Sequence, residues 1–314
     1  MSRASYKHIE FPENKKFAFT IFDDADLASV EGVRPIYDLL SELKIFTTKS
    51  VFVFPCKDKH SPFYGSQTLA NNEYLGFIKK LNENGFEIGF HNASPDSSER
   101  GITISAINRF KELLGFYPKS FANHGGNKEN IYWGRNRFDS TLLRLFMLMK
   151  IGERSFFGED ERSAYFWGDI LRQHISYCRN FVFRGVNLLK INPTLPYRDP
   201  ARPYVPQWFS ACDGGSPKRF NRLLSAKNME KLERQGGVSI VYTHFGAGFV
   251  KNGKINKETR YLLTELSKRD GWFVPVSTLL DYLRARQKNN ECTERERRKM
   301  EYTWFFERLF DRIF

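Results

Sequence analysis

"FAFTIFDDAD", residues 17–26, joins a mostly apolar run to two adjacent aspartates. A short continuous apolar run of this kind predicts a buried strand of a parallel sheet. Asp23 and Asp24 end that run, and carboxylates are costly to bury unless a partner compensates for their lost hydration. Because sites in parallel α/β folds lie at the carboxyl ends of strands, the two aspartates stand where a functional site would form.

Short apolar runs alternate with segments of helical periodicity through most of the chain. We expect further strands at 50–55, 86–91, 120–126, 237–245 and 272–276, and helices at 33–45, 72–85, 97–115, 139–151, 257–270 and 277–286. This alternation predicts parallel strands joined by crossover helices, in a barrel or a doubly wound sheet. Residues 127–236 are less regular, and their Pro-rich stretch predicts a long loop or an insertion near the barrel mouth.

The composition is that of a globular protein. Of the 314 residues, 41% are hydrophobic and 16% are aromatic, which argues against disorder. The four cysteines show no CxxC spacing, so we expect buried thiols and neither a disulfide framework nor a zinc finger. The chain has no run of 18 apolar residues and no apolar secretion signal at its start. We therefore expect a cytoplasmic protein, with attachment to a membrane surface as an open alternative.

The net charge of +13 would draw the protein to nucleic acid, anionic lipid or acidic glycans. The longest basic run, RERRK at 295–299, is interspersed with glutamates, and no nucleic-acid-binding motif accompanies it. We expect no nucleic-acid partner. A negatively charged substrate or a membrane surface would account for the excess charge equally well.

Residues 291–314 read as a unit separate from a barrel that spans 1–290. Their apolar residues fall on one face of a predicted helix: Tyr302, Phe305, Phe306, Leu309, Phe310 and Ile313. Such a stripe is typical of a C-terminal helix docked on the domain. The alternative is a helix that binds a membrane surface or mediates self-association.

His91, His124 and His244 each end a predicted strand, although the chain contains only six histidines. A carboxylate with imidazoles binds a divalent metal such as zinc and leaves positions open for water and substrate. A second carboxylate can take a proton from that water, and a protonated histidine can donate one to a leaving group. Each residue alone is also typical of a turn, a helix N-cap or a structural hydrogen bond. Their joint occurrence at strand ends favours a site.

The order TIFDDAD, NGFEIGFHNAS, FANHGGN and GGVSIVYTHF resembles the polysaccharide deacetylase family, the NodB-type carbohydrate esterases, over about residues 15–290. The resemblance implies a distorted (β/α)7 barrel and metal-assisted hydrolysis of acetyl groups on sugars. It implies that Asp23 is the general base, that Asp24 and His91 are metal ligands, and that His244 is the general acid. The expected substrate is an N-acetylated sugar or glycan precursor, and the expected cofactor is a divalent metal ion, zinc before others.

The sequence departs from the family pattern at two positions. The family's second metal-binding histidine lies four residues after the first, where this chain has Pro95. His124 and Asp96 are the candidates to replace it, and we favour His124 because it ends the next strand. The family's Arg-Pro-Pro motif is replaced by ANHGGN. These departures leave two alternatives open: an inactive barrel that binds a glycan or a protein partner, and an amidohydrolase acting on a small non-sugar amide.

Overall fold

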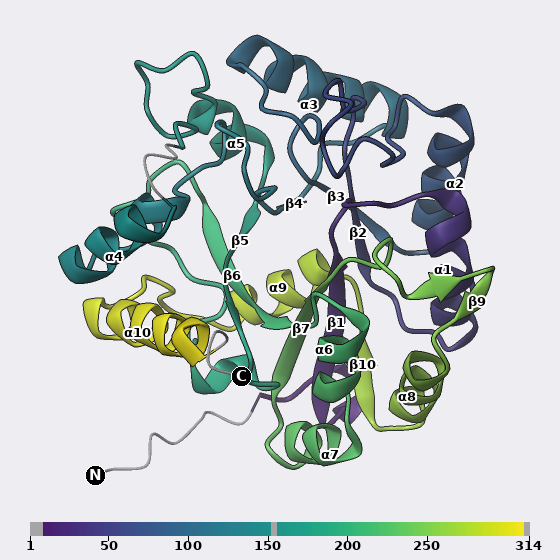
Figure 1. The fold of residues 1–314 in the computed structure, drawn as a ribbon. Coiled ribbons are helices and arrows are strands. Elements are labelled where there is room, and N and C mark those ends of the chain that lie inside the picture. Colours follow the sequence, from purple (N-terminus) through teal and green to yellow (C-terminus); the bar gives the residue numbers. More distant parts are fainter. Residues whose placement is uncertain (1–8, 152–155, 311–314) are drawn as a thin grey trace.

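The computed structural model of the protein describes residues 9–151 and 156–310, and it contains a closed barrel of parallel strands surrounded by helices (Figure 1). Seven strands form the wall in chain order, and the last pairs with the first. The strands are β1 (Phe17–Asp23), β2 (Thr48–Val51), β3 (Glu87–Phe90), β4 (Ser120–Phe121), β5 (Tyr177–Phe183), β6 (Gln207–Asp213) and β7 (Val238–Thr243). The expected (β/α)7-type barrel is confirmed.

One edge of strand β1 pairs with β7, from Ala18 to Asp23. The opposite edge pairs with two strands in succession: the short strand β10 (Gly271–Phe273) beside the start of β1, and β2 beside its end. The barrel is therefore closed by seven strands at the carboxyl ends, and β10 fills the wall beside β1 at the amino end.

Most helices lie on the outside of the barrel and follow the strands that they connect (Figure 1). They are α1 (Val30–Glu42), α2 (Asn72–Glu83), α3 (Arg100–Leu114), α4 (Thr141–Ile151), α5 (Gly168–His174), α6 (Pro217–Leu223), α7 (Ala226–Arg234), α8 (Lys257–Ser267), α9 (Val276–Ala285) and α10 (Glu294–Phe310). Side chains cap several of them: Ser29 accepts from the Gly32 amide and Asn71 from the Tyr74 amide. A small hairpin of β8 (Val250–Lys251) and β9 (Lys254–Ile255) follows β7.

Residues 127–236, which the sequence shows only as less regular, supply two barrel strands that the sequence analysis did not identify, β5 and β6. Their apolar patterns are interrupted by Arg179, Asn180 and Ser210, which are nevertheless buried. The Pro-rich stretch before Gln207 is irregular, as predicted.

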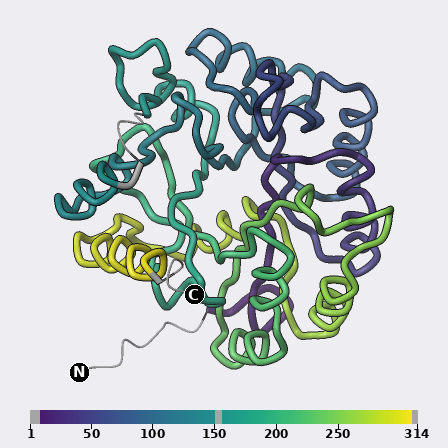
Figure 2. Tube along the Cα trace, viewed as in Figure 1, coloured from purple at the N-terminus to yellow at the C-terminus, as the bar shows by residue number. Residues whose placement is uncertain are grey.

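The C-terminal helix α10 is docked on the domain. The buried carboxylate of Glu301 accepts hydrogen bonds from the amides of Asp139 and Ser140, and Met300 is fully buried. The rings of Phe146 and Phe305 join α10 to α4, and the two helices run side by side (Figure 2).

The outer faces of α4 and α10 stay apolar and exposed, at Leu142, Leu145, Leu148, Met149, Tyr302, Phe306 and Leu309. No helix within the described residues combines the length and the apolar character needed to cross a membrane. Contact of this face with a membrane surface or a second copy stays a prediction. The side chain of Phe310 and all of Ile313, which the sequence placed on the same face, lie outside the described part of the chain.

Candidate active site at the barrel mouth

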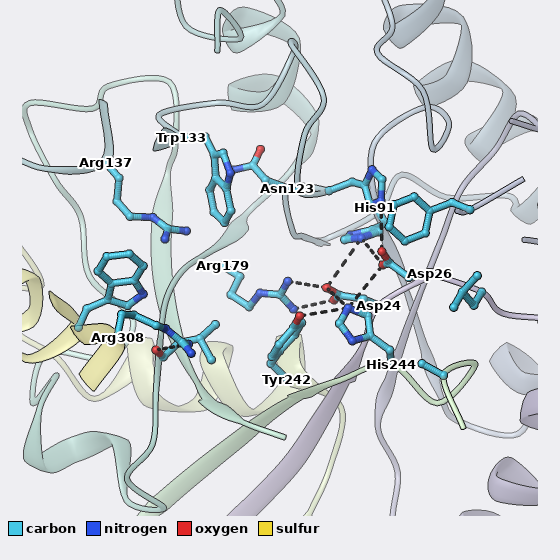
Figure 3. Close-up of a pocket in the computed structure, with 17 residues that line it drawn as sticks. Asp24, Asp26, His91, Asn123, Trp133, Arg137, Arg179, Tyr242, His244 and Arg308 are labelled. Atoms are coloured by element: carbon cyan, nitrogen blue, oxygen red, sulfur yellow. Dashed lines mark hydrogen bonds and ion pairs between the residues drawn. The ribbon is translucent and has the colours of Figure 1, made fainter. Parts of the chain in front are cut away.

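A cavity of about 430 Å³ lies at the carboxyl ends of the barrel strands (Figure 3). The segment directly after β1 supplies Asp24 and Asp26, the segments after three other strands supply His91, His124 and His244, and Arg179 comes from within β5. The predicted convergence of strand ends on one mouth is therefore observed for four of the five predicted site residues: Asp24, His91, His124 and His244. The fifth, Asp23, does not line this cavity.

Asp24 is held by a bidentate ion pair. Each of its carboxylate oxygens accepts a hydrogen bond of 2.6 Å from the guanidinium of Arg179. Burial on its own would raise the pKa of Asp24, but Arg179 and then His91 outweigh it, and the pKa lies below its ordinary value. Asp24 is therefore an ionised carboxylate with a fixed orientation at the cavity wall.

Asp26 lies between two imidazoles. Its Oδ2 is 3.0 Å from Nε2 of His91, and its Oδ1 is 3.1 Å from Nε2 of His124. One ligand atom from each of Asp24, Asp26 and His91 can be chosen so that all three lie within 4.8 Å of one another, and this Asp-Asp-His group could hold a metal ion. Burial opposes ionisation of Asp26, but the two imidazoles hold its pKa well below the ordinary range.

The hydrogen-bond partners of the two imidazoles define which nitrogen carries the proton. Nδ1 of His91 is 2.8 Å from the carbonyl oxygen of Ala122, which can only accept, so Nδ1 donates. Nδ1 of His124 is 3.0 Å from Oδ1 of Asn127. The amide nitrogen of Asn127 donates to the carbonyl oxygen of Ser94, which fixes the amide so that its oxygen faces His124.

In neutral imidazoles, both Nε2 lone pairs therefore point at the Asp26 carboxylate. Nε2 of His124 is buried and makes no hydrogen bond of acceptable geometry with any described residue. Three groups of acceptors facing one another repel unless a cation lies between them. Protons on the imidazoles or a bound metal ion would supply it, so the donor set fits a divalent cation.

His244 stands on the other side of the carboxylates. Its Nε2 is 3.8 Å from Oδ2 of Asp24 and 3.7 Å from Oδ2 of Asp26. Nδ1 lies 3.2 Å from the carbonyl oxygen of Gly215 and so carries a proton, and Nε2 is 3.1 Å from the hydroxyl of Tyr242. Nε2 thus faces the cavity, where it can exchange a proton with a ligand.

Asp23 has a fully buried carboxylate on the opposite side of the wall. Its Oδ2 lies 2.9 Å from Nζ of Lys49 and accepts a 3.0 Å hydrogen bond from the hydroxyl of Tyr37 on α1. Its Oδ1 accepts from the amide of Phe245. Both oxygens are engaged within the protein, so Asp23 is not positioned to meet a ligand in the cavity.

Asp96, in the loop after His91, is the other candidate that the sequence offered for the third metal ligand. The Asp96 carboxylate accepts hydrogen bonds from the amides of Lys57 and Asp58 and from the thiol of Cys56. Those contacts lower its pKa against the opposing effect of burial. Asp96 is therefore occupied by a neighbouring loop, and His124 is the residue that points at Asp26.

Sequence reasoning missed several residues of this site. Asp26 ends the stretch FAFTIFDDAD and lies two residues after Asp24. In an extended chain, side chains two residues apart point to the same side. Arg179 lies in the unrecognised strand β5. Trp304 and Arg308 reach the cavity from α10, which the sequence analysis considered only as a docked helix or as a helix for membrane binding or self-association.

No protein-family profile and no curated protein sequence matches the chain. Solved structures do match it. A protein assigned as a polysaccharide deacetylase from Mycobacterium smegmatis is 13% identical with a TM-score of 0.50, over 91% of this chain and 96% of that one. A probable polysaccharide deacetylase from Pseudomonas aeruginosa PAO1 is 11% identical with a TM-score of 0.50, over 90% and 95%. The PuuE allantoinase is 11% identical with a TM-score of 0.51, over 90% and 95%. The resemblance drawn from the motifs is thereby confirmed at the level of the fold.

Proposed function

We propose that the protein is a metal-dependent hydrolase that removes the acetyl group from an N-acetylated sugar or glycan precursor. The observation that carries this proposal is the pair of imidazole Nε2 atoms that face the Asp26 carboxylate with their Nδ1 protons engaged elsewhere. A hydrogen bond from the other ring nitrogen is the usual means of orienting a histidine ligand toward a metal. The fold shared with deacetylases supports the reaction class.

The residues proposed to hold the ion are Asp26, His91 and His124. This choice keeps the two histidines expected from the sequence and replaces Asp24 by Asp26, because Asp26 is the carboxylate that contacts both imidazoles. Imidazole and carboxylate donors suit zinc, which is the ion we propose. A divalent ion held there would polarise the carbonyl group of the acetyl substituent and lower the pKa of a water molecule.

Asp24 is proposed as the general base in place of Asp23. It lines the cavity, it lies beside the ion-binding group, and its bidentate pair with Arg179 fixes the carboxylate while keeping it ionised. In the reaction, Asp24 would take the proton of the attacking water as the new bond to the acetyl carbon forms.

His244 is proposed as the general acid. In the doubly protonated imidazolium form, Nε2–H of His244 would give a proton to the sugar nitrogen as the carbon–nitrogen bond breaks, releasing acetate and a free amine. The Gly215 carbonyl holds Nδ1, and Tyr242 lies at hydrogen-bond distance from Nε2, so the ring is oriented before a substrate arrives. Over one turnover, Asp24 gains one proton from water and His244 gives up one proton to the leaving nitrogen, so the two transfers balance.

A small non-sugar amide is the second candidate substrate. A cavity of about 430 Å³ is of the size that encloses a small molecule, and one structure of the same fold is named an allantoinase. The two candidates differ in the products, since a sugar substrate yields acetate.

The test is metal content and acetate release, measured for the parent, Asp26→Asn, His124→Gln and Asp24→Asn. His174→Gln, at a histidine outside the cavity that stacks on Tyr117, is the matched control. The proposal expects a single zinc ion per chain in the parent, the control and Asp24→Asn, and loss of zinc in the other two.

Retention of zinc in Asp26→Asn and His124→Gln, with loss in Asp24→Asn, would instead assign the ion to the sequence-derived ligand Asp24. A parent that binds no divalent ion and releases no acetate would favour the inactive barrel. Release of ammonia or urea from small amides, without acetate from sugars, would favour the second candidate.

A further inference from the structure

The cavity has a second wall whose chemistry differs from the carboxylate and imidazole group. Arg137 and Trp133 supply it from the segment before α4, and Arg308 and Trp304 supply it from α10. Figure 3 shows Arg179 between this wall and the two aspartates. The wall therefore belongs to the same cavity, on the far side of Arg179 from the proposed metal ligands.

Arg137 is a buried guanidinium with unused hydrogen-bonding capacity. The residue is 7% exposed, its Cζ lies 3.7 Å from the centre of the Trp133 ring, and one terminal nitrogen donates to the carbonyl oxygen of Asn180. Its Nε is buried without a hydrogen-bond partner among the described residues. Burial, followed by repulsion from Arg308 and Arg179, lowers the pKa of Arg137 to about 9. A buried charge left in this state is unfavourable until an anion approaches.

Hydrogen bonds to two barrel strands hold the Arg308 side chain beside the cavity. It donates to Oδ2 of Asp213 at the end of β6 and to the carbonyl oxygen of Val182 in β5. Arg219 on α6 donates to the same Asp213 oxygen but does not line the cavity. The two arginines thus share a carboxylate partner and differ in their access to a ligand.

The charges around the cavity are unequal. Three guanidiniums line it, at Arg137, Arg179 and Arg308, against the carboxylates of Asp24 and Asp26. Asp24 is already neutralised by Arg179, and Arg308 pairs with Asp213, so Arg137 is the lining guanidinium that has no carboxylate partner among the described residues. A divalent ion at Asp26 would increase the excess. Neutral glycans do not require such a field, whereas a substrate with an anionic group would be attracted and oriented by it.

We propose that Arg137 and Arg308 form a subsite for an anionic substituent, a phosphate or a carboxylate, carried by the sugar whose acetyl group is removed. This inference rests on the proposed deacetylase function and specifies its substrate as a single charged sugar unit. The planar guanidinium fork suits either anion, and Trp133 and Trp304, which also line the cavity, add apolar surface beside the two guanidiniums.

The experiment measures binding to the zinc-loaded protein by calorimetry with three probes. N-acetylglucosamine 1-phosphate carries a phosphate, N-acetylmuramic acid carries a carboxylate, and N-acetylglucosamine carries neither. We expect one of the charged sugars to bind at least about tenfold more tightly than the neutral one, as expected for a charge-assisted hydrogen bond. The tighter of the two identifies the anion.

Arg308→Gln and Arg137→Gln are expected to remove that advantage while leaving the affinity for N-acetylglucosamine unchanged. Arg219→Gln, which loses the same Asp213 contact away from the cavity, is expected to retain it. Melting temperatures are measured for all three variants, and Arg308→Gln serves as the test if Arg137→Gln fails to fold.

Equal affinity of the parent for all three sugars would overturn the proposal, as would an equal loss for all three in Arg308→Gln. Preferential binding of a charged sugar without acetate release would support the subsite and contradict the proposed reaction. Acetate release from a charged sugar that Arg308→Gln leaves unaffected would support the reaction and contradict the subsite.

Discussion

Asp23 and Asp24 are adjacent in the sequence and serve opposite sides of the barrel wall. Asp23 is compensated by Lys49, its in-register neighbour on β2, and by Tyr37 on α1, and neither Asp23 nor Lys49 has exposed surface. Asp24 faces a cavity with Arg179, and beyond it Asp26 faces two imidazoles.

The difference between the two regions lies in what neutralises the carboxylate. A fixed lysine inside a closed pocket leaves no position for a ligand, so Asp23 holds α1, β2 and the end of β7 together. Imidazoles can gain or lose a proton or a metal ion, so the Asp26 group can respond to its surroundings. Adjacent carboxylates are therefore better read as residues on alternating sides of a strand than as one catalytic pair.

The largest expected effect is on catalysis at Asp24. Asp24→Asn should lower kcat for deacetylation about 10²–10⁴-fold, the usual contribution of a general base, with zinc content unchanged. Asp23→Asn should leave kcat of the folded protein near that of the parent. Steady-state acetate release from both variants measures this difference, and a larger loss in Asp23→Asn would reverse the two roles.

The next effect concerns the stability of the closed region. Lys49→Met leaves the Asp23 carboxylate buried without its cation, and the free energy of unfolding should fall by about 3–5 kcal/mol. Urea denaturation followed by circular dichroism measures the change. The double variant Lys49→Met/Asp23→Leu, which removes both charges, should recover most of it, and a double variant as unstable as the single one would contradict an ion-pair explanation.

Tyr37 should have a smaller effect on the same region. Tyr37→Phe removes the 3.0 Å hydrogen bond to Asp23 but keeps the ring, and should cost about 1.5–3 kcal/mol of unfolding free energy. Because the residue lies outside the cavity, kcat should not change. A reduced kcat at unchanged stability would show that the two sides of the wall are coupled.

The smallest effect is expected at Tyr242. Tyr242→Phe removes the hydroxyl 3.1 Å from Nε2 of His244 while Gly215 still holds the ring, so kcat should fall by no more than about tenfold. Zinc content should stay that of the parent. His244→Gln, assayed beside it, should lose far more activity, and similar losses in both would make Tyr242 a participant in proton transfer.

Much of the barrel was predictable from the sequence, because its strands are apolar runs that end in polar residues. The mouth was predictable as well, since His91, His124 and His244 end such runs. The role of Asp26 was harder to see, because the DDAD spacing shows which residues share a side but not which side faces the cavity.

The missing parts of the site come from segments without an apolar signature or from distant ones. Arg179 interrupts the pattern of β5, so neither the strand nor its pairing with Asp24 was apparent. Arg308 lies on a helix whose amphipathic pattern is typical of simple docking, and only tertiary structure brings it to the cavity. Such residues are set by packing between elements, which local periodicity does not report.

The pairing of β1 with β7 has a consequence for how the chain folds. Ala18 is among the first strand residues to be synthesised, and its partner Val238 follows only after all the other wall strands. Contacts so distant in sequence slow folding, because a long loop must close before they form. Until β7 leaves the ribosome, the Phe-rich strand that bears the aspartates has an open edge, which is a template for aggregation. Yield in the cell should thus depend on temperature and chaperone supply during synthesis more than on the stability of the finished barrel.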